Sequence, residues 1–313
     1  MVFVTPTTTE VLQWEGLHLF HFEQSTCSKK VRTVLALKEL NCELHHIDLR
    51  THENKVEHFL GINPRGLLPV LVHDGRVIVE NNDIVAYLDE AFGPNSSIPT
   101  RGLADATTPA ALRAEDALHM AIRTLTFSFR IPSVLGRVPE DKLSVYRDRG
   151  ASVKGNGQDH AQQITFWTSY NEHGGCSGDA IVNAYDAIRE AFDGLEEALN
   201  GAQYLSTTCD VLSLTDVVWF PTVRRIFLCG YDLRRYGSVS LPRHQPDVRT
   251  QAPFSLGLAR AHADTLSDRP LRRADGRPRQ RPLRVAVPYG NDCRGLRRGP
   301  SSSSALQAES LTT

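Results

Sequence analysis

The sequence has no run of eighteen or more apolar residues, and this absence argues against a membrane-spanning helix. Its six cysteines are scattered over 313 residues and none are spaced as CxxC, so we expect neither a disulfide framework nor a zinc site. Free thiols are typical of a reducing compartment, which predicts a cytoplasmic protein. The twelve histidines lack the i,i+4 spacing of a zinc-protease motif, and we expect no metal cofactor.

Lysine is missing from residues 237–313, which carry thirteen arginines, six acidic residues and eight prolines. This segment has a net charge of +7, whereas the preceding 236 residues have −8. Such density of proline and charge predicts a disordered tail. Two explanations are open. The tail is a basic arm that binds nucleic acid or an anionic surface, or it is an out-of-frame or intron-derived translation that replaces the true C-terminus. Lysine disappears abruptly at the start of this segment, which favours the second explanation. Nucleic acid is therefore not an expected partner.

The rest of the chain has an ordinary globular composition, and its length allows two domains. Residues 1–16 lack the basic start and the apolar stretch of a secretory signal, and we expect a flexible leader there. Residues 94–108 are rich in Gly, Pro, Ser and Thr and predict an interdomain linker.

Residues 17–93 predict a thioredoxin-like α/β domain. A β-prone run at 17–22, an apolar helical stripe and a second run at 43–49 form a βαβ unit with parallel strands. Asp74 and Gly75 separate two valine-rich runs, which indicates a tight hairpin. A helix at about 82–92 closes the unit.

Pro69 lies inside an apparent strand, where a proline removes a ladder hydrogen bond. A cis bond before Pro69 explains this position and turns the backbone of Leu68 outward, where it can pair with an extended peptide ligand. The alternative is a trans proline in an edge strand, which the surrounding pattern favours less.

Cys27 lies where the first strand meets the first helix. Unpaired N–H groups at a helix start favour a thiolate, and three basic residues follow, so we expect a lowered thiol pKa and a reactive sulfur. A buried structural cysteine is the alternative.

Three segments together resemble the glutathione transferase N-terminal domain. They are residues 25–32 (STCSKKVR), 63–71 (NPRGLLPVL) and 80–84 (ENNDI). The first resembles the zeta class, which includes maleylacetoacetate isomerases, and the related glutathione-dependent reductive dehalogenases; it is also similar to ganglioside-induced differentiation-associated proteins. The resemblance covers roughly 75 residues, and it is specific only in combination.

The resemblance implies a role for each matching residue. Ser25 or Cys27 would contact the sulfur of glutathione, with Cys27 as nucleophile if the chemistry resembles that of the dehalogenases. Leu68, before cis-Pro69, would pair with the cysteinyl part. Glu80 and Asn81 would hold the γ-glutamyl end. Asn81 departs from the usual Ser or Thr, but its backbone N–H at a helix start can still bind a carboxylate.

Residues 109–236 predict an all-α domain. Ser213 and Asp216 resemble a capping box, with Leu212 and Val217 as a hydrophobic staple. A similar box occurs in the C-terminal domain of glutathione transferases. Met120, Leu125, Phe127 and Phe129 could line an acceptor pocket, although such residues are more often core.

The resemblance therefore implies a cytoplasmic, homodimeric detoxification enzyme that uses glutathione as co-substrate and a small electrophile as substrate. Conjugation is the default reaction, and Cys27 also permits reductive dehalogenation or isomerisation. A non-catalytic binding or scaffold relative and a glutaredoxin-like thiol exchanger stay open. An exchanger usually has Cys or Ser three residues after the reactive cysteine, where this chain has Lys30.

Overall fold

A computed structural model describes residues 1–93, 104, 108–153, 158–200, 202–205, 212–233 and 236. The predicted tail at 237–313 and most of the predicted linker lie outside these residues. None of the helices described is both long enough and apolar enough to cross a bilayer.

A five-stranded sheet forms the centre of the N-terminal domain, in the order β1-β5-β4-β2-β3. Strands β2 (Leu17–His21) and β3 (Cys42–His46) are parallel, as the βαβ pattern predicts, because helix α1 connects them across one face. Strands β4 (Val70–His73) and β5 (Arg76–Val79) run antiparallel on the other side of β2. This mixed sheet confirms the predicted thioredoxin-like fold.

The prediction of a flexible leader at 1–16 is wrong. Strand β1 (Val2–Val4) pairs antiparallel with β5 and forms the edge of the sheet. A 3-10 helix, η1 (Thr9–Gln13), follows, with Val11 fully buried. The Thr8 hydroxyl donates to the carbonyl of His58 at 2.8 Å. A strand of three residues is too short to show an alternating pattern in the sequence. The pairing of β1 depends instead on the free edge that β5 offers.

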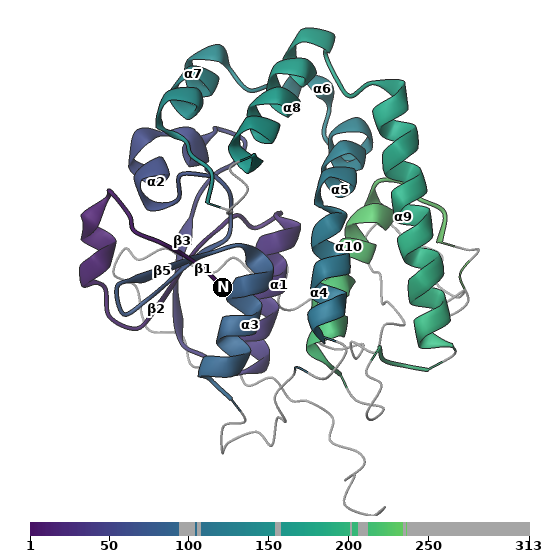
Figure 1. The fold of residues 1–313 in the computed structure, drawn as a ribbon, viewed down its shortest axis with the longest axis horizontal. Coiled ribbons are helices and arrows are strands. Elements are labelled where there is room, and N and C mark those ends of the chain that lie inside the picture. The colour runs from purple at the N-terminus through teal and green to yellow at the C-terminus, as the bar shows by residue number, and fades with distance from the viewer. Residues whose placement is uncertain are drawn as a thin grey trace, which may run out of the picture.

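Helices cover both faces of the sheet (Figure 1). Helices α1 (Thr26–Leu37) and α3 (Asn81–Ala91) lie on one face, where their apolar stripes join an apolar core with β2, β4 and β5. The 3-10 helix η2 (Glu53–Lys55) and α2 (Glu57–Ile62) precede β4, and α2 packs on the opposite face. These two cores hold the strand ends and helix starts at fixed positions.

The hairpin between β4 and β5 forms as the sequence predicts. Asp74 and Gly75 both have positive φ, 48° and 74°, as a two-residue turn of this kind requires. A Cβ on Gly75 would lie 2.3 Å from the carbonyl oxygen of Leu12, so η1 packs directly against the turn.

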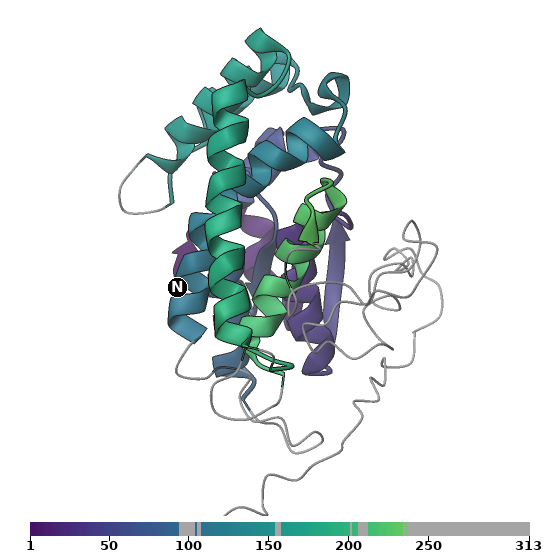
Figure 2. The same ribbon diagram turned by 90° about the vertical axis from the view of Figure 1, so that its right-hand side faces the viewer.

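The remaining described chain is helical, as predicted (Figures 1 and 2). Its elements, in chain order, are α4 (Thr108–Ala117), α5 (His119–Leu125), the π-helix η3 (Thr126–Arg130), α6 (Ser133–Gly136), α7 (Glu140–Arg149), α8 (Asp159–His173), α9 (Gly178–Leu199) and α10 (Leu214–Leu228). The N-terminal domain meets this helical part where α1 packs on α10 and where η2 and α2 pack on α7.

The capping box of α10 forms as predicted. The Ser213 hydroxyl accepts from the Asp216 N–H, and the Asp216 carboxylate accepts from the Ser213 N–H at 2.9 Å. Asp216 also accepts from the N–H of Leu205 at 2.8 Å. Leu212 and Val217 belong to the core beside α1 and α3, so the staple fixes α10 against the N-terminal domain.

A buried ionic network joins the two domains behind the start of α1. The Lys30 ammonium lies 2.5 Å from a Glu115 carboxylate oxygen and donates to Asn81 Oδ1 at 3.0 Å. Glu115 also accepts from the Thr222 hydroxyl at 2.7 Å and from the Asn82 amide at 3.3 Å. The side chains of Lys30 and Glu115 are 1% and 4% exposed, so the pair depends on its geometry and hydrogen bonds to offset desolvation.

His21, at the end of β2, should make stability depend on pH. The Arg32 guanidinium donates to His21 Nδ1 at 2.9 Å, which requires an unprotonated Nδ1. Burial, helped by Arg32, lowers the pKa of His21 from 6.5 to about 3. Between these two pKa values His21 is protonated in the unfolded chain but neutral in the folded chain. The contribution of His21 to the free energy of unfolding is therefore fully present above pH 6.5 and is lost as pH falls toward 3.

We expect protonation of His21 to lower the free energy of unfolding by on the order of 3–5 kcal/mol between these pH values. Urea unfolding between pH 3.5 and 7 measures it. His21→Asn keeps an acceptor for Arg32 but cannot titrate, and it should show a clearly shallower pH dependence. Equal slopes for the two proteins would refute the prediction.

Candidate functional site

Ser25 and Cys27 lie at the start of α1, as predicted. Ser25 is the N-cap, and its hydroxyl oxygen accepts from the N–H of Ser28 at 3.2 Å. Its own O–H proton can still be donated to a ligand, because a hydroxyl accepts and donates at once. Cys27 lies one residue into the helix as a free, partly buried thiol.

The expected acidity of Cys27 is not found. Burial raises the pKa of its thiol above the ordinary value for cysteine; Glu115 and Glu80 add to this increase, while Lys30 and Arg123 oppose it. Desolvation therefore outweighs the helix start and the neighbouring cations. Burial also raises the pKa of the three other described thiols, Cys42, Cys176 and Cys229. Cys27 is thus distinguished by its position rather than by its acidity.

The bond between Leu68 and Pro69 is cis, as the sequence predicts. Val70 pairs with Phe20, which places Pro69 opposite the end of β2 and the loop that leads to α1. Within the described residues, the backbone N–H and C=O of Leu68 have no hydrogen-bond partner. Leu68 is itself buried, and buried backbone groups are normally paired. A ligand with an extended backbone can satisfy them.

Glu80 and Asn81 lie at the start of α3. Glu80 has φ 68°, an unusual conformation for a residue with a side chain, and its carboxylate does not cap the helix. The N–H groups of the first turn therefore lack a side-chain cap. The Asn81 side chain accepts from Lys30, so any contact of Asn81 with an anion falls to its backbone N–H.

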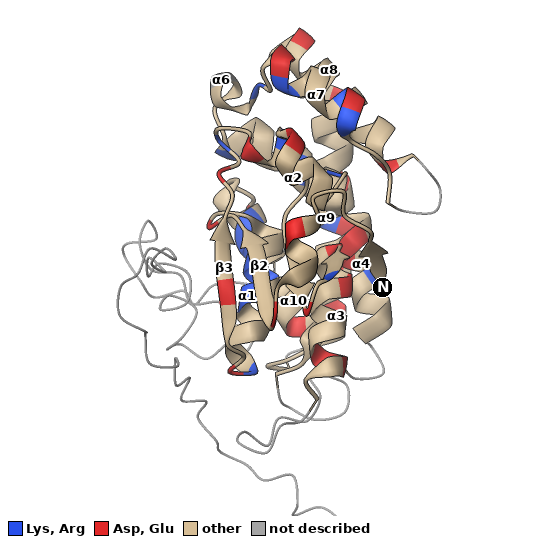
Figure 3. Cartoon of the chain, turned by 90° about the vertical axis from the view of Figure 1, so that its left-hand side faces the viewer, with Lys and Arg blue, Asp and Glu red and all other residues tan. Residues whose placement is uncertain are grey.

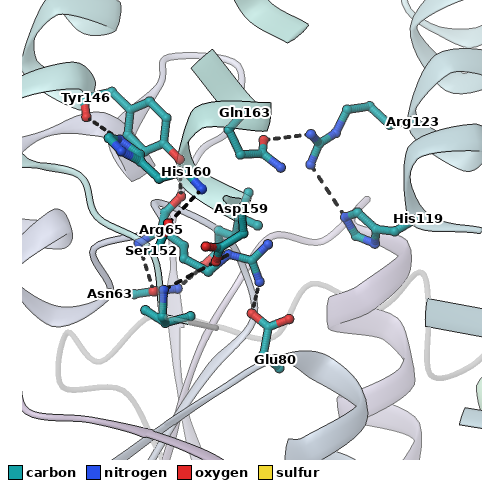
Figure 4. A network of polar contacts seen from close by, with 12 residues as sticks. Asn63, Arg65, Glu80, His119, Arg123, Tyr146, Ser152, Asp159, His160 and Gln163 are labelled. Carbon is teal, nitrogen blue, oxygen red and sulfur yellow. Dashed lines mark hydrogen bonds and ion pairs between the residues drawn. The ribbon is translucent and has the colours of Figure 1, made fainter. Parts of the chain in front are cut away.

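Arg65, which the sequence shows only as part of a motif, lies between two acidic side chains (Figure 4). Its guanidinium is ion-paired with Glu80 and lies 3.0 Å from a carboxylate oxygen of Asp159, at the start of α8. The Tyr146 hydroxyl donates to the carbonyl of Arg65 at 3.0 Å. Arg65 therefore fixes Glu80 and connects the loop before β4 to the helical domain.

Two cations complete the region, the buried Lys55 and the half-buried Arg123, and sequence reasoning missed both. The Lys55 ammonium lies 3.7 Å from the centre of the Tyr146 ring, and burial lowers its pKa to about 7. Arg123, in α5, donates to Gln163 at 2.6 Å, and burial lowers its pKa to about 10 (Figure 4). In the part of the chain that the structure describes, neither cation has a carboxylate partner.

The two cations lie in one region with Cys27. The charge of Arg123 lowers the pKa of both Lys55 and Cys27, and such an effect requires that the three groups be near one another. Basic residues also gather along α1, as Figure 3 shows. The sequence held no signal for Lys55 or Arg123, since each comes from a different domain and neither lies in a motif.

A separate cavity of about 360 Å³ lies beside the π-helix. Phe127 and Phe129, two of the four predicted pocket residues, line it together with Cys176 and the neighbouring glycines. Leu125 is buried in the helical core instead, and Met120 is exposed.

Residues 19–96 match the sequence profile of the glutathione S-transferase N-terminal domain. Two similar relatives are a protein named glutathione S-transferase 1 from Dianthus caryophyllus, 40% identical over 85 residues, and a probable maleylacetoacetate isomerase from Caenorhabditis elegans, 40% identical over 72 residues. The matches cover 27% and 23% of this chain and 38% and 33% of those proteins. The chain thus spans less than two fifths of the length of either relative.

The resemblance extends to the helical part in three dimensions. The crystal structure of the beta-etherase LigF from Sphingobium sp. strain SYK-6 superposes with a TM-score of 0.54 at 24% identity, over 70% of this chain and 87% of that one. This likeness supports the two-domain fold. Residues 19–96 are therefore a glutathione S-transferase-like N-terminal domain.

Proposed function

We propose that this protein binds glutathione between its two domains and transfers it to a small electrophile. The observation that carries the proposal is the pair of cations, the buried Lys55 and the half-buried Arg123, with no carboxylate partner among the described residues. A buried charge is costly unless it is paired, so this arrangement favours an anionic ligand. Glutathione brings two carboxylates and one ammonium group.

The remaining groups fit the other parts of the same molecule. The unpaired N–H and C=O of Leu68 can hydrogen-bond the cysteinyl backbone. The uncapped start of α3 can receive the γ-glutamyl carboxylate, and the Glu80 carboxylate can face the ammonium group. The glutathione sulfur then lies at the start of α1, with the glycyl carboxylate toward Lys55 and Arg123.

The raised pKa of Cys27 favours one role for its thiol. At neutral pH Cys27 is protonated, so it can donate an S–H hydrogen bond to a glutathione thiolate, together with the Ser25 hydroxyl. Bound glutathione is then the nucleophile, and a carbon–sulfur bond forms as the leaving group departs. Reductive dehalogenation and isomerisation stay alternatives. A homodimer, a cytoplasmic location and a role in detoxification remain predictions.

Retention on immobilised glutathione tests the proposal. We expect the wild-type protein and Cys27→Ala both to be retained and to elute with free glutathione. Arg123→Met should elute early, whereas Arg189→Met, which removes an exposed arginine of α9, should behave as wild type. Mass analysis should show no Cys27–glutathione adduct after turnover of an aryl chloride. Absence of retention of the wild-type protein would overturn the proposal.

Lys55 offers a prediction that depends on pH. With a pKa of about 7, the Lys55 side chain is mostly a neutral amine at pH 8, and a ligand carboxylate should raise that pKa. Binding of S-methylglutathione at pH 8 should therefore take up close to one proton, and at pH 6 almost none. Calorimetry in buffers of different ionisation enthalpy measures this uptake. Lys55→Met should abolish it; an undiminished uptake in that variant would assign the proton to another group.

A further inference from the structure

Strands β2 and β3 bring together three side chains that can bind a metal ion. In the parallel register, His18 lies opposite Glu43, and Phe20 lies opposite His45. Because side chains alternate along a strand, His18, Glu43 and His45 share one face of the sheet. Figure 3 shows the two strands side by side. This cluster lies on the face opposite α1 and outside the residues proposed to bind glutathione.

The two imidazoles are close enough to hold one ion. His18 Nδ1 lies 3.1 Å from His45 Nε2, and carboxylate oxygens of Glu43 lie 3.6 Å from the first nitrogen and 3.9 Å from the second. Two nitrogens bound to one tetrahedral Zn²⁺ at about 2.0–2.1 Å are about 3.3 Å apart. The Glu43 side chain is 50% exposed, so a small rotation can bring its oxygen into range.

The tautomer of His18 also suits a ligand. His18 Nε2 lies 2.9 Å from the carbonyl oxygen of Glu15, an acceptor only, so Nε2 carries the proton. In the neutral ring Nδ1 is then the acceptor nitrogen, and it lies next to His45 and Glu43. Metal-binding histidines commonly donate their second ring N–H to a backbone carbonyl in this way.

Trp14 holds both rings in place. Its ring centre lies 4.6 Å from that of His18 and 4.7 Å from that of His45, and the second pair is stacked at 21°. His45 also packs 5.0 Å from Phe20. Rings fixed on both sides lose little freedom when an ion binds, which favours a preformed site.

We propose that His18, His45 and Glu43 bind a divalent transition-metal ion of the zinc, copper or nickel class. Two imidazoles and one carboxylate suit these ions better than Mg²⁺ or Ca²⁺, which prefer sets of oxygen ligands. Three protein ligands leave a fourth position for water on the solvent side of Glu43. The competing arrangement is a plain N–H···N hydrogen bond from His45 to His18 with no affinity for metal.

Calorimetric titration of the metal-stripped full chain with Zn²⁺ tests the proposal. We expect one tight equivalent in the wild-type protein. His45→Phe keeps the ring stack without a nitrogen and should weaken that step at least about tenfold. Glu43→Gln should weaken it less. The matched control is His46→Phe, which changes the exposed neighbour on the opposite face and should bind as wild type.

Tryptophan fluorescence gives a second, local measurement. Cu²⁺ bound at this site should quench Trp14, and Trp14→Phe should remove the quenched fraction of the signal. Far-ultraviolet circular dichroism of each variant checks that the fold is kept. The proposal is overturned if the wild-type protein shows no tight equivalent, or if folded His45→Phe and His18→Phe bind Zn²⁺ as wild type does.

Discussion

Replacing Lys30 with methionine is expected to lower the free energy of unfolding by about 3–5 kcal/mol. The variant leaves the Glu115 carboxylate buried between α1, α4 and α10, with hydrogen bonds from Thr222 and Asn82 but no cation. Desolvation of that unpaired charge, rather than lost packing, accounts for the effect, since methionine nearly fills the lysine volume. Urea unfolding followed by tryptophan fluorescence measures it.

The double variant Lys30→Met/Glu115→Leu separates this explanation from a simple packing defect. Removing both charges should recover most of the lost stability, because apolar replacements of a buried pair are often neutral or stabilising. The control is Arg147→Met, which breaks the exposed pair with Glu140 and should change stability by at most about 0.5 kcal/mol. A single-variant loss below about 1 kcal/mol would mean that water reaches Glu115.

Cys27→Ala is expected to lower kcat/KM for conjugation of an aryl chloride about tenfold to a hundredfold, whereas Cys27→Ser should stay within about threefold of wild type. The proposed role of Cys27 is to donate a hydrogen bond to the glutathione thiolate, and a serine hydroxyl can do the same. If Cys27 instead forms a mixed disulfide with glutathione, serine abolishes the reaction. Steady-state kinetics of the two variants therefore distinguish donor from nucleophile.

The pH profile provides an independent check of the same role. Burial raises the pKa of Cys27, so a reaction of its thiolate would keep accelerating, about tenfold per pH unit, across the range in which an ordinary thiol titrates. A reaction of activated glutathione levels off earlier, at the pKa of the bound glutathione thiol. We expect the levelling profile.

Ser25→Asp is the companion variant. Aspartate is as good an N-cap as serine and can accept from the Ser28 N–H, so stability should be kept. Its carboxylate cannot donate to a thiolate and repels it, and conjugation should fall. Full activity of Ser25→Asp would remove Ser25 from the proposed site.

Local sequence determined a large part of this molecule. The Asp74-Gly75 turn, the cis bond before Pro69, the parallel β2–β3 pair and the capping box at Ser213 all follow from short-range patterns, and the structure contains each of them. Turn chemistry, strand alternation and helix capping act between residues only a few positions apart, so one sequence is enough to read them. The family motifs likewise lie on short continuous segments.

Tertiary structure decided what depends on residues distant in the chain. Strand β1 exists because β5 offers an open edge, which no three-residue pattern announces. The pKa of Cys27 rises because burial and the nearby Glu115, a residue of the helical domain, disfavour its thiolate, so the expectation based on the helix start was wrong. His18 and His45 become neighbours only through the strand register.

The charged groups at the proposed glutathione site also depend on tertiary structure. Lys55 and Arg123 come from different domains and come together only after folding, which is why the sequence predicted the backbone half of the proposed site but not its cations. The sequence by itself determined the class of fold and the placement of Cys27, Leu68 and Glu80, because backbone geometry is encoded locally. Burial and charge depend on which surfaces the two domains bury against each other, and only the folded chain fixes those.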